Sequence, residues 1–457
     1  MHHNHSASSL HANYSLLHYV NARAMEQTGP LTIVKGNNIY VEDESGNQYI
    51  EAMAGLWSVA VGFSEKRIAE AAYKQLQKLP YYHSFGGSSH ESAALLAQTL
   101  IDMAPADMSR AHFTNSGSEA NDTAIKLARY YHHACGKPDK QVIISREKAY
   151  HGSTIGSGSL TGLPFAHQGF GMPIENIGFT SCPHYWRYGH DNESEEAFST
   201  RCAAELEATI QEQGGTDKVA AFIGEPVMGV GGVIPPPTGY WQKIAEVCNA
   251  HNMLLIADEV ICGFGRTGAR FGCDKYNIRP DILVLSKQLT SSYMPMAAVL
   301  INDKVYQKAA DNSQKFGIFG NGITGAAHPL ACAVALENLR ILTEDGIMDR
   351  VAVLEPIFQS RIQQLAKFPQ IGEVRGVGLI GAIEIVADRK TKEPFQPVGS
   401  QGAALRQLCI NEGVIVRNLV DSIAFCPPLI ITEQQIHDLF DRVQAALEQH
   451  AQSLNLQ

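Results

Sequence analysis

The chain has 457 residues, of which 45% are hydrophobic and 18% are charged, which is the balance of an ordinary globular protein. Its 36 Lys and Arg residues against 46 Asp and Glu residues give a net charge of −10, and no basic run occurs. This composition argues against nucleic-acid binding and against binding to an anionic membrane. No apolar run reaches the roughly 18 residues of a membrane-spanning helix.

Nine cysteines are scattered between Cys135 and Cys426, and none forms a C-x-x-C pair. An odd number of unpaired cysteines is typical of reduced thiols and argues against a disulfide framework or a zinc site. The chain starts Met1-His2-His3-Asn4-His5, without the basic and apolar regions of a secretory signal, and we assign no metal to these histidines. These features predict a cytoplasmic protein without a metal site.

The first 30 residues predict an arm that packs on another part of the protein, because polar residues alternate there with Tyr14, Leu16, Leu17 and Tyr19. Residues 33–41 and 42–50 contain short β-branched runs separated by turn residues, which predicts antiparallel strands. Residues 65–79 have apolar side chains at helical spacing.

From about residue 90 the pattern alternates between helices and near-continuous apolar strands. Helices are predicted over residues 92–103, 118–135, 199–212 and 239–251, and strands over 110–114, 141–145, 219–223, 253–257 and 282–285. Such strands are typical of a mostly parallel sheet with helices on both faces. After about residue 330 the pattern becomes α+β, with helices over 330–343, 347–367, 400–412 and 433–450 and strands near 373–385 and 413–426.

Two of the predicted strands each have one charged residue at or just after their carboxyl end. Asp258 ends one strand, and Lys287 follows the next strand about thirty residues later. Ligands bind at these strand ends in parallel sheets. A lysine can form a Schiff base with pyridoxal phosphate (PLP), and an aspartate can keep the ring nitrogen protonated. The simpler interpretations are a surface lysine and a salt-bridged aspartate.

Two further segments fit the same cofactor. Ser116, Gly117 and Ser118 follow a strand and open a helix, where N–H and hydroxyl groups can bind a phosphate. The alternative is an ordinary helix cap by Ser116 or Ser118. Tyr150 follows the next strand and can stack on a pyridine ring, with Val260 beneath the ring, although a tyrosine there is more often simply packed.

These motifs, in this order and spacing, resemble those of the class III aminotransferases of PLP fold type I, from about Ile33 to Phe440. The segments that carry the resemblance are residues 114–121, 150–152, 225–229, 258–260, 263–268 and 286–287. It implies an α/β fold, with a large domain (residues 56–328) around a mostly parallel central sheet and a smaller α+β domain from both termini (residues 1–55 and 329–457). Residues 54–57, 82–85 and 182–189 look most like those of amine–pyruvate (ω-) transaminases.

The resemblance also implies residue roles. Lys287 would be the catalytic residue, which binds PLP and moves a proton, and Thr324 would reach the phosphate from the partner subunit of a homodimer, with pairing of dimers into tetramers left open. The implied cofactor site consists of Ser116, Gly117, Ser118, Tyr150, His151, Glu225, Asp258, Val260, Lys287 and Thr324. The implied substrate pocket consists of Leu56, Trp57, Phe85, Tyr150, Val230 and Arg417. Arg417 would grip the carboxylate of pyruvate or alanine and swing away for an amine, or else form a structural salt bridge.

Two segments depart from the family pattern. The loop at 320–327 before His328-Pro329 has smaller residues than the family usually shows, and Met294 and Met296 flank Pro295. The chain is thus predicted to be a PLP-dependent ω-transaminase that moves an amino group from a primary amine or ω-amino acid to pyruvate by a ping-pong mechanism. Two alternatives stay open: a 2-oxoglutarate-dependent ω-amino-acid aminotransferase or aminomutase of the same fold, and an inactive α/β scaffold.

Overall fold

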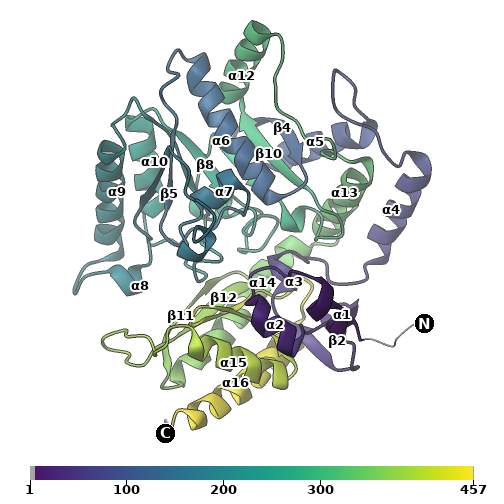
Figure 1. The fold of residues 1–457 in the computed structure, drawn as a ribbon, viewed down its shortest axis with the longest axis vertical. Coiled ribbons are helices and arrows are strands. Elements are labelled where there is room, and N and C mark those ends of the chain that lie inside the picture. The colour runs from purple at the N-terminus through teal and green to yellow at the C-terminus, as the bar shows by residue number, and fades with distance from the viewer. Residues whose placement is uncertain (1–5, 456–457) are drawn as a thin grey trace.

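The computed structural model describes residues 6–455 and consists of two lobes, with both ends of the chain in the same lobe (Figure 1). The histidines at positions 2, 3 and 5, where no metal is expected, lie outside the described residues. No helix between residues 6 and 455 combines the length and the apolar character needed to cross a lipid bilayer. All nine cysteines are free thiols, as expected.

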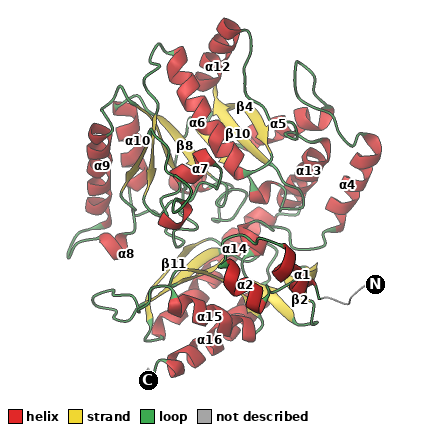
Figure 2. Ribbon diagram, viewed as in Figure 1, coloured by secondary structure: helices red, strands yellow, loops and turns green. Residues whose placement is uncertain are grey.

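The upper lobe is built on a seven-stranded sheet that confirms the predicted mostly parallel topology (Figure 2). In sheet order its strands are β4 (Met108–Thr114), β10 (Ala297–Asn302), β9 (Ile282–Leu285), β8 (Leu254–Asp258), β7 (Val219–Gly224), β5 (Val142–Arg146) and β6 (Ile177–Thr180). Strand β10 runs in the direction opposite to the other six strands of this sheet. The sequence analysis did not predict β6 and β10.

The strands are continuously apolar because the sheet is buried on both faces. Ile282 and Val284 of β9 pack in one hydrophobic core with residues of α6, whereas Leu283 and Leu285 pack in a second core on the opposite face. The helices of this lobe are α4 (Lys66–Lys78), α5 (Glu91–Met103), α6 (Gly117–Ala134), α7 (Ile155–Leu160), α8 (Tyr185–Tyr188), α9 (Glu195–Glu212), α10 (Tyr240–Ala250), α11 (Gly272–Tyr276), α12 (Asp303–Phe316) and α13 (Pro329–Glu344).

The lower lobe joins segments from the two ends of the chain. Strands β1 (Ile33–Asn37), β2 (Tyr40–Asp43) and β3 (Gln48–Glu51) form a sheet with β13 (Val414–Ile415), which pairs in parallel with β3. A second, antiparallel sheet has the order β11 (Ile371–Val377), β12 (Ile380–Ile385), β15 (Ser422–Phe425) and β14 (Arg417–Leu419). Its helices are α14 (Ile347–Gln363), α15 (Ser400–Asn411) and α16 (Glu433–Ser453). The domain boundaries at residues 55 and 328 stay predictions.

The N-terminal arm contains two short helices, α1 (Ala7–Tyr14) and α2 (Ala22–Thr28), and a further short helix, α3 (Ala54–Trp57), follows β3. Between α1 and α2 the arm reaches the functional side of the molecule, where the Tyr19 hydroxyl lies 3.2 Å from the Tyr150 hydroxyl. The predicted packing of the arm on another part of the protein is therefore observed.

Candidate active site

A cavity of about 260 Å³ lies where strands β4, β5, β8 and β9 end, and we call it the Lys287 cavity. All residues of the predicted cofactor site except Thr324 line it. Further residues that line it were not among the predicted site residues, and they include Asn121, Gly152, Ser286, Thr290, Met294 and Met296. The carboxyl ends of parallel strands thus gather side chains that are far apart in the sequence.

Lys287 is separated from the end of β9 by Ser286 and is the first residue of a 3-10 turn formed by Lys287–Leu289. Its φ of 48° lies in the left-handed region, which costs a residue other than glycine about 1–3 kcal/mol. Burial lowers the pKa of the Lys287 ammonium, against the opposing charges of Asp258 and Glu225. A strained backbone and a destabilised charge are both typical of catalytic residues.

Asp258 is only 3% exposed, and three donors hold its carboxylate in place. Asn121 donates to Oδ2 over 2.8 Å, His151 Nδ1 donates to the same oxygen over 2.7 Å, and the Val260 N–H donates to Oδ1 over 3.1 Å. Because these donors fix the carboxylate, it remains able to accept one more hydrogen bond from a cationic N–H in the cavity.

Glu225 acts on the backbone beside the cavity. Its Oε1 accepts a hydrogen bond from the Tyr150 N–H over 3.1 Å, and its Oε2 accepts one from the Gly229 N–H over 2.9 Å. Burial raises the pKa of Glu225. The carboxylate therefore ties the segment that carries Tyr150 to the segment after β7.

The N-terminus of α6 opens into the cavity. Ser116 is the N-cap and accepts a hydrogen bond from the Glu119 N–H over 3.2 Å, so the simple capping interpretation holds for this residue. Ser118 Oγ accepts from the Ser153 N–H over 3.1 Å. A side chain at Gly117 would lie 3.4 Å from Val260 Cγ2, so this helix end packs directly beside Val260. Both serine hydroxyls retain a proton to donate to an anion at the helix terminus.

A larger cavity of about 1300 Å³, here called the outer groove, shares Gly152 with the Lys287 cavity. Val230 and Arg417 line it together with residues 16–20 of the N-terminal arm. Among residues 6–455 the Arg417 guanidinium has no ion pair and no hydrogen bond, which contradicts a structural salt bridge at this position. Burial lowers its pKa.

The remaining predicted residues line neither cavity of this chain. Trp57 is buried in a hydrophobic cluster with Met53, Val227 and other side chains. Leu56 and Phe85 are 53% and 45% exposed, and Thr324 is also exposed. Phe85 lies against the loop of Thr324, because a side chain at Gly322 would be 2.9 Å from Phe85 Cζ.

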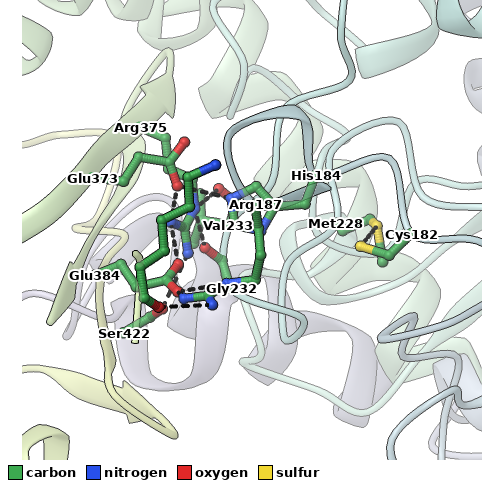
Figure 3. A network of polar contacts seen from close by, with 11 residues as sticks. Cys182, His184, Arg187, Met228, Gly232, Val233, Glu373, Arg375, Glu384 and Ser422 are labelled. Carbon is green, nitrogen blue, oxygen red and sulfur yellow. Dashed lines mark hydrogen bonds and ion pairs between the residues drawn. The ribbon is translucent and has the colours of Figure 1, made fainter. Parts of the chain in front are cut away.

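Beside the outer groove, an ion network links the two lobes (Figure 3). Arg187, at α8, pairs with Glu384 of β12, and Arg375 of β11 pairs with both Glu373 and Glu384. His184 Nε2 lies 2.7 Å from Glu373 Oε2. Ligand atoms of His184, Glu373 and Glu384 lie within 4.8 Å of one another, as they do in metal sites, but here the two arginines neutralise the carboxylates.

Comparison with known proteins decides the family. The sequence model described as "Aminotransferase class-III" matches residues 21–447. This chain belongs to the class III aminotransferases. Its structure is similar to the omega transaminase from Pseudomonas jessenii in complex with PMP (TM-score 0.97, 48% identity, 99% of both chains) and to the PMP-bound aminotransferase from Vibrio fluvialis (TM-score 0.95, 39% identity, 98% of both chains). It is 46% identical to gamma aminobutyrate transaminase 3, chloroplastic, of Solanum lycopersicum, over 92% of this chain and 81% of that protein.

Class III aminotransferases use PLP, and the Lys287 cavity of this member fits the cofactor. His151 Nε2 and Asn121 Oδ1 are buried without a hydrogen-bond partner in the described residues, so the cavity wall still has polar capacity for a ligand. Asp258 would contact the ring nitrogen, Tyr150 and Val260 would lie on the two ring faces, and the N-terminus of α6 would hold the phosphate. When bound, PLP supplies an electron sink for the carbon that bears the amine.

Lys287 would be the base at this site. Because burial lowers its pKa, more of its amine is neutral near pH 7 than for an exposed lysine. Asp258 would keep the ring nitrogen protonated, and Glu225 would keep Tyr150 in place through its backbone N–H. The sequence analysis did not predict that Asn121 contacts Asp258 or that Tyr19 contacts Tyr150. Asn121 carries a usable signal, since it lies one turn after Gly117 on α6.

Proposed function

We propose that this class III aminotransferase moves an amino group from a primary amine or an ω-amino acid to pyruvate, with alanine as one product. The Arg417 guanidinium carries the proposal, because it lies half-buried beside an apolar groove and has no partner among residues 6–455. A guanidinium in such a place can bind a small carboxylate through two parallel hydrogen bonds. The apolar walls leave the rest of the groove to a hydrocarbon group.

The relatives' names support both halves of this proposal. Solved structures at 48% to 49% identity are ω-transaminases, among them variants engineered for synthesis of enantiopure bulky amines. The curated relatives are named gamma-aminobutyrate transaminases, after an ω-amino acid. An enzyme that accepts both a primary amine without a carboxylate and an ω-amino acid agrees with both groups.

We further propose a homodimer whose active sites lie at the interface. Leu56, Phe85 and Thr324 are exposed and line neither cavity of their own chain. Tyr81 donates a hydrogen bond to the Thr324 carbonyl over 2.9 Å, so this loop is held together with the segment of Phe85. A second copy would bring this exposed apolar surface against the cavity of the first.

The choice of amino acceptor tests the proposal. The enzyme is first converted to its pyridoxamine form with 1-phenylethylamine, and pyruvate or 2-oxoglutarate is then added while the cofactor spectrum is followed. We expect a rapid return to the aldehyde form with pyruvate. A return with 2-oxoglutarate alone would establish the 2-oxoglutarate-dependent alternative instead.

A further inference from the structure

The outer groove has more cationic than acidic side chains. The groove is lined by two acidic side chains, Glu384 and Asp421, and by three strong cations, Lys148, Arg187 and Arg417. Glu384 is already bound by Arg187 and Arg375. Asp421 accepts hydrogen bonds from the backbone N–H groups of Gly399 and Gly402 over 2.6 and 2.8 Å. Two cations, Lys148 and Arg417, are left without an anion among the described residues.

Lys148 is held in this position by the backbone. It has a φ of 63°, in the left-handed region that is unfavourable for lysine. Its N–H donates to the Gly162 carbonyl over 2.8 Å, and a side chain at Gly231 would lie 2.4 Å from the Lys148 carbonyl oxygen. The residue is thus packed against Val230-Gly231, two residues before Tyr150, in the segment that leads from the outer groove to the Lys287 cavity.

Lys148 is half-buried, and within residues 6–455 its ammonium lies over the Tyr188 ring, whose centroid is 5.4 Å from Nζ, and forms no ion pair. A ring face stabilises a cation less than a carboxylate does, and it leaves the N–H donors of the ammonium free. The groove therefore presents one unpaired cation on the segment of Tyr150 and a second one, Arg417, on β14.

We propose that Lys148 binds the distal carboxylate of ω-amino acid donors, so that these donors extend from Lys287 through the outer groove. This assignment rests on the proposed function and names a specificity residue for it. Arg417 then serves the carboxylate of the keto acid, and the two carboxylates of the two half-reactions use different cations. The apolar walls between them favour donors with several methylene groups over shorter ones.

Two amine donors that differ only in the distal carboxylate measure how much that carboxylate contributes to kcat/KM. Values of kcat/KM are measured with saturating pyruvate for 6-aminohexanoate and for hexylamine, which has the same six-carbon chain and amino group but no carboxylate. We expect Lys148→Met to lower the ratio of the two values by about tenfold or more, mainly because the amino acid binds more weakly and its KM rises. Lys148→Arg keeps the charge and is expected to keep most of the ratio.

Lys315→Met is the control, because Lys315 also lies over an aromatic ring, that of Phe316 at 5.5 Å, but it does not line the groove. It is expected to leave the ratio unchanged. The unmodified enzyme gives a second readout that needs no variant: the ratio must fall when NaCl is raised from about 0.02 to about 0.5 M, because salt screens the ion pair.

Two results would overturn the assignment to Lys148: a ratio in Lys148→Met within about twofold of the parent, or a parent ratio that salt does not change. If the pyridoxamine form of the parent returns to the aldehyde form with 2-oxoglutarate but not with pyruvate, the proposed acceptor is wrong. The same ratio is then measured with 2-oxoglutarate, so the two proposals fail separately.

Discussion

Two groups of charged residues in this enzyme differ in how completely their charges are paired. In the network between the lobes, Arg187, Arg375, Glu373 and Glu384 each have an oppositely charged partner. In the Lys287 cavity, one strained lysine faces two carboxylates, Asp258 and Glu225, and buried polar atoms lack partners. The paired group joins the lobes, whereas the unpaired group retains the capacity to bind a cofactor and move protons.

Replacement of Lys287 is expected to have the largest effect on activity. Lys287→Ala removes both the covalent attachment of PLP and the base, so we expect kcat to fall by roughly 10⁴-fold or more. Stopped assays with 1-phenylethylamine and pyruvate measure the rate, and the visible absorption of the lysine-bound cofactor is expected to disappear. A variant with near-normal turnover would show that another residue carries the chemistry.

Asp258→Asn is expected to have the next largest effect. Asparagine keeps the size of the side chain but cannot stabilise a protonated ring nitrogen, so we expect kcat to fall by roughly 10²- to 10³-fold. PLP affinity, measured by titration of the apo-enzyme, is expected to weaken as well. Unchanged kcat would show that this carboxylate is structural.

In the network between the lobes, the effect is expected on stability. Burial alone would raise the pKa of Glu384, but the charges of Arg375 and Arg187 outweigh it and lower the pKa to about 2. The folded-state pKa lies below the ordinary value of 4.5, so this stabilisation is complete above about pH 4.5 and is lost as the pH falls toward 2.

Glu384→Gln leaves Arg375 and Arg187 with one carboxylate fewer, and we expect a loss of about 3 kcal/mol in the free energy of unfolding at pH 7. The loss is expected to shrink below pH 4.5 in urea titrations. Glu70→Gln breaks the exposed pair with Lys74 and is the control, for which no measurable change is expected. Equal losses in the two variants would contradict the distinction between buried and exposed pairs.

Much of the fold could be read from hydrophobic periodicity. The predicted helix at 118–135 is observed at Gly117–Ala134, and the predicted strand at 282–285 is observed unchanged. Strand β10 was missed although it is a short apolar run, and its antiparallel direction is set by pairing with β9, which is near in the sequence, and with β4, which is distant. The predicted helix at 347–367 ends as an α-helix at Gln363 and continues as a 3-10 turn.

The site residues also fall into those that the sequence could place and those that it could not. Asp258, Tyr150 and Lys287 could be brought together from sequence because strand ends of a parallel sheet meet at one edge. Thr324 and Phe85 could not be placed, because their predicted roles depend on a second chain. Lys148 carries no local signal, since its proposed role depends on the finding that both acidic side chains of the groove are already bound by other groups.

The stability of apo-enzyme Lys287→Met tests the central claim most directly. If the cavity reduces stability in favour of chemistry, replacement of the desolvated ammonium by an apolar side chain of similar length should raise the thermal midpoint by about 1–3 °C while turnover is lost. A midpoint that falls by several degrees would show that Lys287 stabilises the fold, and would contradict the account.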